Sequence, residues 1–296
     1  MTPAAWRGVV EHLRERFGLS DRRSCRSASL SCSVWTYQQH RGDDPVLRGR
    51  LLELSVRCPR YGYEMLHLKL RREGLLVNHK RVLRIYREER LALRPRSKRK
   101  RAAAAPREVR QAPTALNVRW SMDFMSDTLE SGRVFRVLNI DDEYSRESLA
   151  IEPDLSLPAE RVVRFLDRLA LERGLPRAVT VDNGTEVVSK ALDRWAYRCH
   201  VELCFIRPGK PIENAFIESF NGTLRDECLN AHWGTSLREA RMVLERWRRE
   251  YNEERPHTSL GGLTPREFAA LRSLPKSQQE ALYGLQTREP QEEAVA

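Results

Sequence analysis

The chain has 296 residues and carries 52 Lys and Arg against 41 Asp and Glu, a net charge of +11. This length is enough for two or three domains. No run of about 18 apolar residues and no secretion signal is found, so no membrane span is expected and a cytoplasmic protein is predicted. Residues 1–110 carry a net charge of +16 and the remainder −5. The front third is therefore expected to bind a polyanion, and the remainder to hold a local acidic site.

The cysteines give no sign of a metal or disulfide framework. None of the six belongs to a C-x-x-C pair or to a pattern with paired histidines. This spacing argues against a zinc site and against structural disulfides, so reduced thiols are expected.

Residues 1–44 form the first predicted region. Apolar residues at helical spacing predict a helix over 3–18, a second helix through residue 28, and a third segment at 32–37. This rhythm fits a helix-turn-helix, and a small packing bundle is the alternative.

Residues 45–94 form a second all-helical region with a helix-turn-helix pattern. Helices are predicted over 46–56, 61–72 and 80–90, and Gly74 ends the second of them. Such a region places one helix in the major groove with basic side chains on phosphates. The candidate DNA contacts are Arg71, Arg72, Lys80, Arg81, Arg84 and Arg87.

Two segments lack any core pattern. The basic stretch 95–113 is interpreted as a flexible linker, which acts as a plain spacer, as an arm that follows phosphates, or as both. The polar tail 273–296 is expected to be disordered.

Residues 114–272 show a different pattern, in which strands alternate with helices. Three short strands are predicted over 118–125, 134–141 and 145–151, followed by a helix to residue 173. A strand at 178–182, a helix at 187–199, a strand at 201–205 and helices at 212–230, 236–251 and from 264 complete the order. Strands and helices in this order predict an α/β domain with a mixed five-stranded sheet.

The stretch from Gly209 to Arg225 is central to the functional hypothesis. At the helical period, Phe216, Phe220 and Leu224 form an apolar stripe for burial. The opposite face carries Asn214, Glu218, Asn221 and Arg225. Lys210 precedes the helix and is expected to point at DNA, with a solvated loop lysine as the alternative. Alone, this pattern is typical of any amphipathic helix.

Two aspartates in strand-like surroundings change that interpretation. Asp123 lies in Trp-Ser-Met-Asp-Phe, Asp182 begins Asp-Asn-Gly-Thr-Glu, and 35 residues separate Asp182 from Glu218. The order resembles the D,D(35)E pattern of retroviral-integrase-type transposases. These strings, with Glu-Ser-Phe-Asn-Gly and Asn-Glu-Glu-Arg-Pro-His, resemble second-reading-frame transposases of bacterial insertion sequences of the insertion-sequence-3 type. The resemblance covers about residues 20–270.

The resemblance implies a ribonuclease-H-like catalytic core preceded by the helix-turn-helix region, with Asp123, Asp182 and Glu218 as catalytic residues and metal ligands. The zinc-binding module of retroviral integrases has no counterpart here. Hard Mg²⁺ prefers oxygen ligands, and two such ions stabilise the attacking and leaving oxygens of a phosphodiester. Two Mg²⁺ ions, or Mn²⁺ in their place, are expected, with Arg225 and Asn221 near the DNA.

The predicted function is metal-dependent DNA cleavage followed by 3′-hydroxyl strand transfer at the ends of a mobile element. The resemblance implies double-stranded DNA, both terminal inverted repeats and target, as partner. It also implies a homo-oligomer on paired ends, an upstream-reading-frame protein as partner or fusion, and a place on the bacterial nucleoid. The alternatives are a DNA-binding regulator or decayed transposase, and a ribonuclease-H-like nuclease without strand transfer.

Overall fold

The computed structural model describes residues 3–36, 44–93, 112–182, 189–206, 214–275 and 278. The chain divides into two compact units at residue 48, in the first turn of the fourth helix. Most of the predicted linker and tail lie outside the described residues, as does Lys210. Within the described part of the chain, no helix combines the length and apolar character needed to cross a bilayer.

The first unit contains the three predicted short helices, α1 (Pro3–Phe17), α2 (Asp21–Ser27) and α3 (Cys32–Thr36). They pack around the buried side chains of Val10, Cys25 and Ala28. So small a core is expected of three short amphipathic segments.

Helices α4 (Pro45–Arg57), α5 (Tyr63–Arg72) and α6 (His79–Glu88) confirm the second predicted helical region. Gly74 has a φ of +87°, a conformation that glycine adopts without strain, and it ends α5 as predicted. Asn78 begins α6, because its side-chain oxygen accepts a hydrogen bond from the backbone N–H of Lys80 at 2.8 Å.

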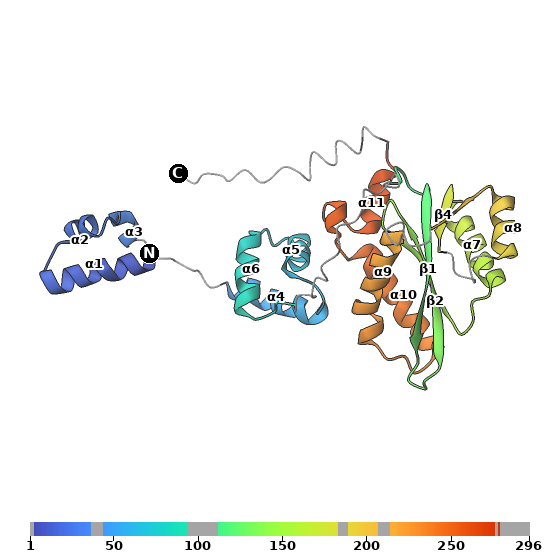
Figure 1. Cartoon of the computed structure of the whole chain (residues 1–296), viewed down its shortest axis with the longest axis horizontal. Coiled ribbons are helices and arrows are strands. Elements are labelled where there is room, and N and C mark those ends of the chain that lie inside the picture. Colours follow the sequence, from blue (N-terminus) through green and yellow to red (C-terminus); the bar gives the residue numbers. More distant parts are fainter. Residues whose placement is uncertain are drawn as a thin grey trace. The chain divides into compact units, whose positions relative to one another are not determined.

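The rest of the chain is a three-layer α/β/α core (Figure 1). Its strands are β1 (Arg119–Thr128), β2 (Val134–Asp142), β3 (Ser148–Asp154), β4 (Ala178–Val181) and β5 (Glu202–Phe205). Its helices are α7 (Ala159–Arg173), α8 (Lys190–Cys199), α9 (Ala215–Glu227), α10 (Leu237–Glu253) and α11 (Pro265–Arg272), with short 3₁₀ turns at Leu229–Ala231 and Thr258–Leu260. The strand order is β3-β2-β1-β4-β5, antiparallel among β1 to β3 and parallel from β1 to β5 through β4. The predicted mixed five-stranded sheet is confirmed.

Side chains alternate between the two faces of this sheet. Trp120 and Met122 of β1 belong to the apolar cluster formed with α7 and α8, whereas Met125 belongs to the cluster formed with α9 and α10. Figure 1 shows these helix pairs on opposite sides of the sheet. By the same alternation, Ser121 and Asp123 lie on the face covered by α9 and α10.

Strand β3 begins at Ser148, three residues later than predicted. The carboxylate of Asp142 accepts hydrogen bonds from the backbone N–H groups of Tyr144 and Ser145 and from the Ser145 hydroxyl. Arg146 then takes a φ of +63°. These contacts build a tight turn in place of the predicted extended chain.

Helix α9 is shorter than the predicted 212–230, and its buried stripe differs from the prediction. Residues 212 and 213 lie outside the described residues, and the helix ends at Glu227. Ile217 is fully buried with Phe220 and Leu224, whereas Phe216 is 39% exposed beneath the guanidinium of Arg146. Spacing of i, i+3 and i+7 follows the 3.6-residue period as well as i, i+4 and i+8 does, so the pattern left both stripes open.

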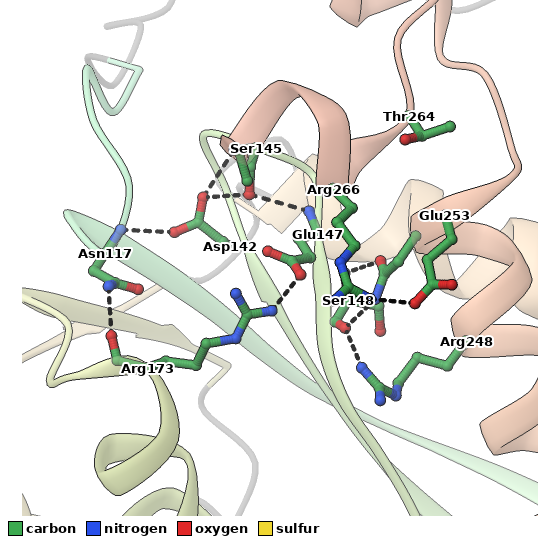
Figure 2. Close-up of polar contacts among 12 residues, drawn as sticks. Asn117, Asp142, Ser145, Glu147, Ser148, Arg173, Arg248, Glu253, Thr264 and Arg266 are labelled. Carbon is green, nitrogen blue, oxygen red and sulfur yellow. Dashed lines mark hydrogen bonds and ion pairs between the residues drawn. The ribbon is translucent and has the colours of Figure 1, made fainter. Parts of the chain in front are cut away.

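Strand β3 is an edge strand, and side chains of α10 bond to the backbone of Ser148 on its outer edge. Asn252 accepts from the Ser148 N–H at 2.9 Å and donates to the Ser148 carbonyl at 2.8 Å. Arg248 donates to the same carbonyl at 3.0 Å (Figure 2). These bonds leave the edge without free pairing groups at this point and hold α10 in register with the sheet.

Candidate active site

Asp123 and Asp182 come from neighbouring parallel strands. Ser121 of β1 pairs in register with Thr180 of β4, and β4 ends at Val181. Asp123 and Asp182 each follow two residues later, so both belong to the sheet face covered by α9. Both side chains are half-buried. The order of strands thus brings together two carboxylates that are far apart in sequence.

Glu218 reaches this region from α9. Helix α9 packs its buried stripe onto the sheet, which leaves Glu218 exposed on another side of the helix. The pKa of Asp123 is raised to about 6, first by burial and then by the negative charges of Asp182 and Glu218. Asp182 and Glu218 therefore both lie within electrostatic reach of Asp123.

A chain of two amides reaches Asp123 from the neighbouring strand and helix. Asn221 donates its side-chain amide to the Asp123 carboxylate at 2.7 Å. The amide of Asn139, on β2 directly opposite Asp123, donates to the Asn221 oxygen at 2.6 Å. Asn221 was predicted near DNA, and here it contacts a carboxylate. Asn139 was missed, although a lone amide in the apolar run Val-Leu-Asn-Ile was a visible signal.

Glu143 is a second residue of the site that was not predicted from the sequence. It is 4% exposed and accepts hydrogen bonds from the hydroxyl groups of Ser121 at 2.6 Å and Thr180 at 3.0 Å. One carboxylate thereby joins β1 to β4 just before Asp123 and Asp182. No local pattern marked it, because its partners come from two distant strands.

The residue types of the site suit a divalent cation, although the described carboxylates are not closely grouped. Carboxylate oxygens are the ligands that Mg²⁺ prefers, and a cation would offset both the burial and the neighbouring negative charges that raise the pKa of Asp123. Among the described residues, no three His, Cys, Asp or Glu side chains are grouped closely enough to hold a metal ion. Segments 183–188 and 207–213, which adjoin Asp182 and α9, lie outside the described residues.

The remaining predicted contacts vary in their surroundings. Arg225 donates to the backbone oxygen of Ser126 on β1 at 2.8 Å, so it braces α9 against the sheet. Arg72 forms two hydrogen bonds with Glu267, at 2.6 and 2.7 Å, and Arg84 pairs with Glu88 at 2.9 Å. Five of the six candidates on α5 and α6 are exposed, namely Arg71, Arg72, Lys80, Arg81 and Arg87, and Arg84 is half-buried.

The segment from Asn252 to His257 contacts both β3 and the end of α9. Arg255 forms two hydrogen bonds with Glu227 at the end of α9, at 2.7 and 3.1 Å. Burial, with the positive charges of Arg255 and Arg146, lowers the pKa of His257 to about 3. The imidazole lies edge-on to the Tyr251 ring and remains neutral near pH 7. His257 therefore has a packing role.

The fold and this site define an integrase-type catalytic core. Models of the integrase core domain match residues 113–211 and 199–265, and an HTH-like domain matches residues 37–100. An insertion element IS407 protein of Burkholderia multivorans is 47% identical over 259 residues, covering 87% of this chain and 93% of that protein. An insertion element IS476 protein of Xanthomonas euvesicatoria is 43% identical over 271 residues, covering 91% of this chain and 78% of that protein.

A simian T-cell lymphotropic virus intasome structure, solved with the PP2A regulatory subunit B56 gamma, shares the fold. It superposes with a TM-score of 0.50 at 14% identity over 76% of this chain and 75% of that chain. The chain belongs to the integrase-core transposases of bacterial insertion sequences. DNA binding and transposition are the functions of this family.

Proposed function

We propose that this transposase cleaves DNA and joins strands through a site of Asp123, Asp182 and Glu218 that holds two Mg²⁺ ions. The observation that carries the proposal is the placement of Asp123 and Asp182 at neighbouring parallel strands, on the sheet face covered by α9, the helix that bears Glu218. The three come from separate parts of the fold, so the proposed site depends on the tertiary structure and not on one local motif. Mn²⁺ is expected to substitute for Mg²⁺.

The residues around the site hold and orient its groups. Asn221 holds the carboxylate of Asp123 through its 2.7 Å hydrogen bond, and Glu143 ties together the strands that carry both aspartates. Arg225 keeps α9 against β1 and presents a positive charge near the path of a phosphate backbone. When bound, the cations supply positive charge for the attacking and leaving oxygens of the phosphodiester.

We assign DNA binding and catalysis to different regions of the chain. Residues 45–94 are proposed to bind the terminal inverted repeats, and residues 114–272 to carry out cleavage and joining. The segment at 1–44 is proposed as a further DNA-binding region, and 95–113 as the link between the two activities. The proposal includes a homo-oligomer on paired ends and an upstream-reading-frame protein as partner or fusion.

The test is a nicking and joining assay on a labelled duplex that carries the inverted repeats flanking the gene. Wild type with Mg²⁺ is expected to nick the repeat end and then join the freed 3′-hydroxyl to a target duplex. Asp182→Asn is expected to lose both activities and to keep DNA binding. Asp127→Asn, on β1 beyond the site, is the matched control and is expected to stay active.

Each rival function corresponds to a distinct outcome. Equal nicking by wild type and Asp182→Asn would overturn the catalytic assignment. Binding without turnover in Mg²⁺ or Mn²⁺ would identify a regulator or a decayed transposase. Nicking without joining would identify a nuclease of the ribonuclease-H-like type.

A further inference from the structure

We propose that Asn139 is a positioning residue of the active site, which acts on Asp123 by holding the amide of Asn221 in place. The inference rests on the proposed function in one respect, namely that Asp123 binds the catalytic cation. It concerns a residue on β2 that lies outside the carboxylate pattern.

The direction of the hydrogen-bond chain follows from the chemistry of its end. A carboxylate accepts hydrogen bonds and donates none, so Asn221 must turn its NH₂ group toward Asp123. Its oxygen then faces Asn139, which must present its own NH₂ group, as the 2.6 Å contact requires. Asn139 adds a second bond at the other end of the same amide, so any rotation of the Asn221 side chain would break two hydrogen bonds and not one.

The burial of Asn139 argues against a role in packing alone. Asn139 is fully buried, and its remaining oxygen has no hydrogen-bond partner in the described residues. A buried amide with an unpartnered oxygen destabilises a fold relative to an apolar side chain of the same size. Packing alone would therefore favour leucine at residue 139. The presence of asparagine at this position is explained by the hydrogen bond that it donates toward the active site.

The register of the sheet places Asn139 for this role. Asn139 pairs with Asp123 across β1 and β2, so both side chains rise from the same face. Asn221 lies above them, on the α9 turn that follows Glu218. A single amide thus links the strand that bears Asp123 to the helix that bears Glu218, and Asn139 holds that amide in place.

The test is a double-mutant cycle on the full chain with Asn139→Leu, Asn221→Leu and the double variant. Calorimetric titration with Mn²⁺ measures cation binding without DNA, and urea unfolding measures stability. Asn139→Leu is expected to be at least as stable as wild type and to bind Mn²⁺ about 3- to 10-fold more weakly. Because Asn139 acts through Asn221, the double variant is expected to bind no more weakly than Asn221→Leu.

A second readout follows the Asn221 side chain directly. In ¹⁵N NMR spectra of the metal-free protein, the NH₂ protons of Asn221 are expected to exchange slowly with solvent in wild type and faster in Asn139→Leu. A purely structural role for Asn139 would change stability and leave this exchange unaltered. Should Asn139→Leu fail to fold, Asn139→Ala removes the same donor with less bulk and carries the same expectations for Mn²⁺ binding and for NH₂ exchange.

The outcomes separate this inference from the proposed site. Wild-type Mn²⁺ affinity in Asn139→Leu, or fully additive losses in the double variant, would overturn the positioning role. Asp182→Asn is measured in parallel and is expected to lose affinity. If Asp182→Asn instead binds Mn²⁺ as wild type does, the proposed metal site itself fails.

Discussion

Ser121 and Thr180 face each other on adjacent parallel strands, and their hydroxyl groups donate to the same buried carboxylate, that of Glu143. Each hydroxyl lies two residues before a proposed catalytic aspartate. The spacing of Asp123 and Asp182 therefore depends on a contact that neither aspartate makes. The charge that completes this contact comes from the turn after β2.

Glu143→Ala is expected to lower the free energy of unfolding by about 2–3 kcal/mol, because two buried hydroxyl groups lose their acceptor. Glu143→Gln keeps an acceptor oxygen and is expected to lose less. Urea unfolding of both variants measures the difference. Equal losses would show that the charge of Glu143, and not its accepting oxygen, is what matters.

Asp123→Asn is expected to stabilise the metal-free protein above about pH 6. The native state favours the protonated carboxyl, since its pKa is raised to about 6, so ionisation at higher pH lowers stability. One unit of pKa is worth about 1.4 kcal/mol, and partial exposure leaves a gain of about 1–2 kcal/mol. Thermal unfolding in EDTA at about pH 8 and about pH 4.5 should show the gain at the higher pH alone. A similar gain in Asp127→Asn would point to a nonspecific charge effect.

His257 is expected to reduce stability in acid. The unfolded imidazole takes up a proton below about pH 6.5, whereas the native one stays neutral until about pH 3. Stability contributed by the neutral ring is thus lost as pH falls through this window, by up to about 1.4 kcal/mol per pH unit. His257→Phe keeps an aromatic ring against Tyr251 and removes the titrating group. Its free energy of unfolding should fall less steeply than that of wild type between about pH 6 and about pH 4.5. Parallel curves for the two proteins would contradict the assignment.

The ion pair between Arg255 and Glu227 is expected to anchor the end of α9. The two side chains are 18% and 13% exposed, so removing one leaves a poorly solvated charge. Glu227→Ala should cost about 3 kcal/mol, and Arg255→Ala more, because Arg255 also stacks on Tyr61 and Tyr251. The double variant should lose less than the sum of the two in urea unfolding. Additive losses would mean that the pair contributes nothing as a pair.

Basic residues of α5 and α6 should differ in their effect on DNA binding. Lys80→Ala and Arg87→Ala are each expected to reduce the slope of log affinity against log salt by about 1, as loss of a phosphate contact does. Arg72→Ala is expected to leave the slope unchanged, because Glu267 already occupies its guanidinium. Fluorescence anisotropy between about 50 and about 200 mM salt measures each slope. An equal reduction in Arg72→Ala would show that DNA displaces Glu267.

The sequence alone determined which elements form, since apolar periodicity, caps and glycine stops are local. Thr264 and Glu267 illustrate this, because their predicted helix start is observed as a reciprocal capping box. The predicted start of β3 was wrong because the side chain of Asp142 accepts hydrogen bonds from backbone N–H groups of the turn before it. In α9, two apolar stripes fitted one helical period, and only the sheet surface selected Ile217 over Phe216.

The carboxylate pattern could be predicted because spacing along the chain carries it. The residues that hold these carboxylates in place could not be predicted from the sequence. Asn139, Glu143 and the Arg255–Glu227 pair act through partners between 22 and 82 residues away. Hydrogen bonds and charges depend on distance in space, and strand order and helix docking set those distances. The tertiary structure alone therefore decided which polar groups surround the proposed catalytic residues.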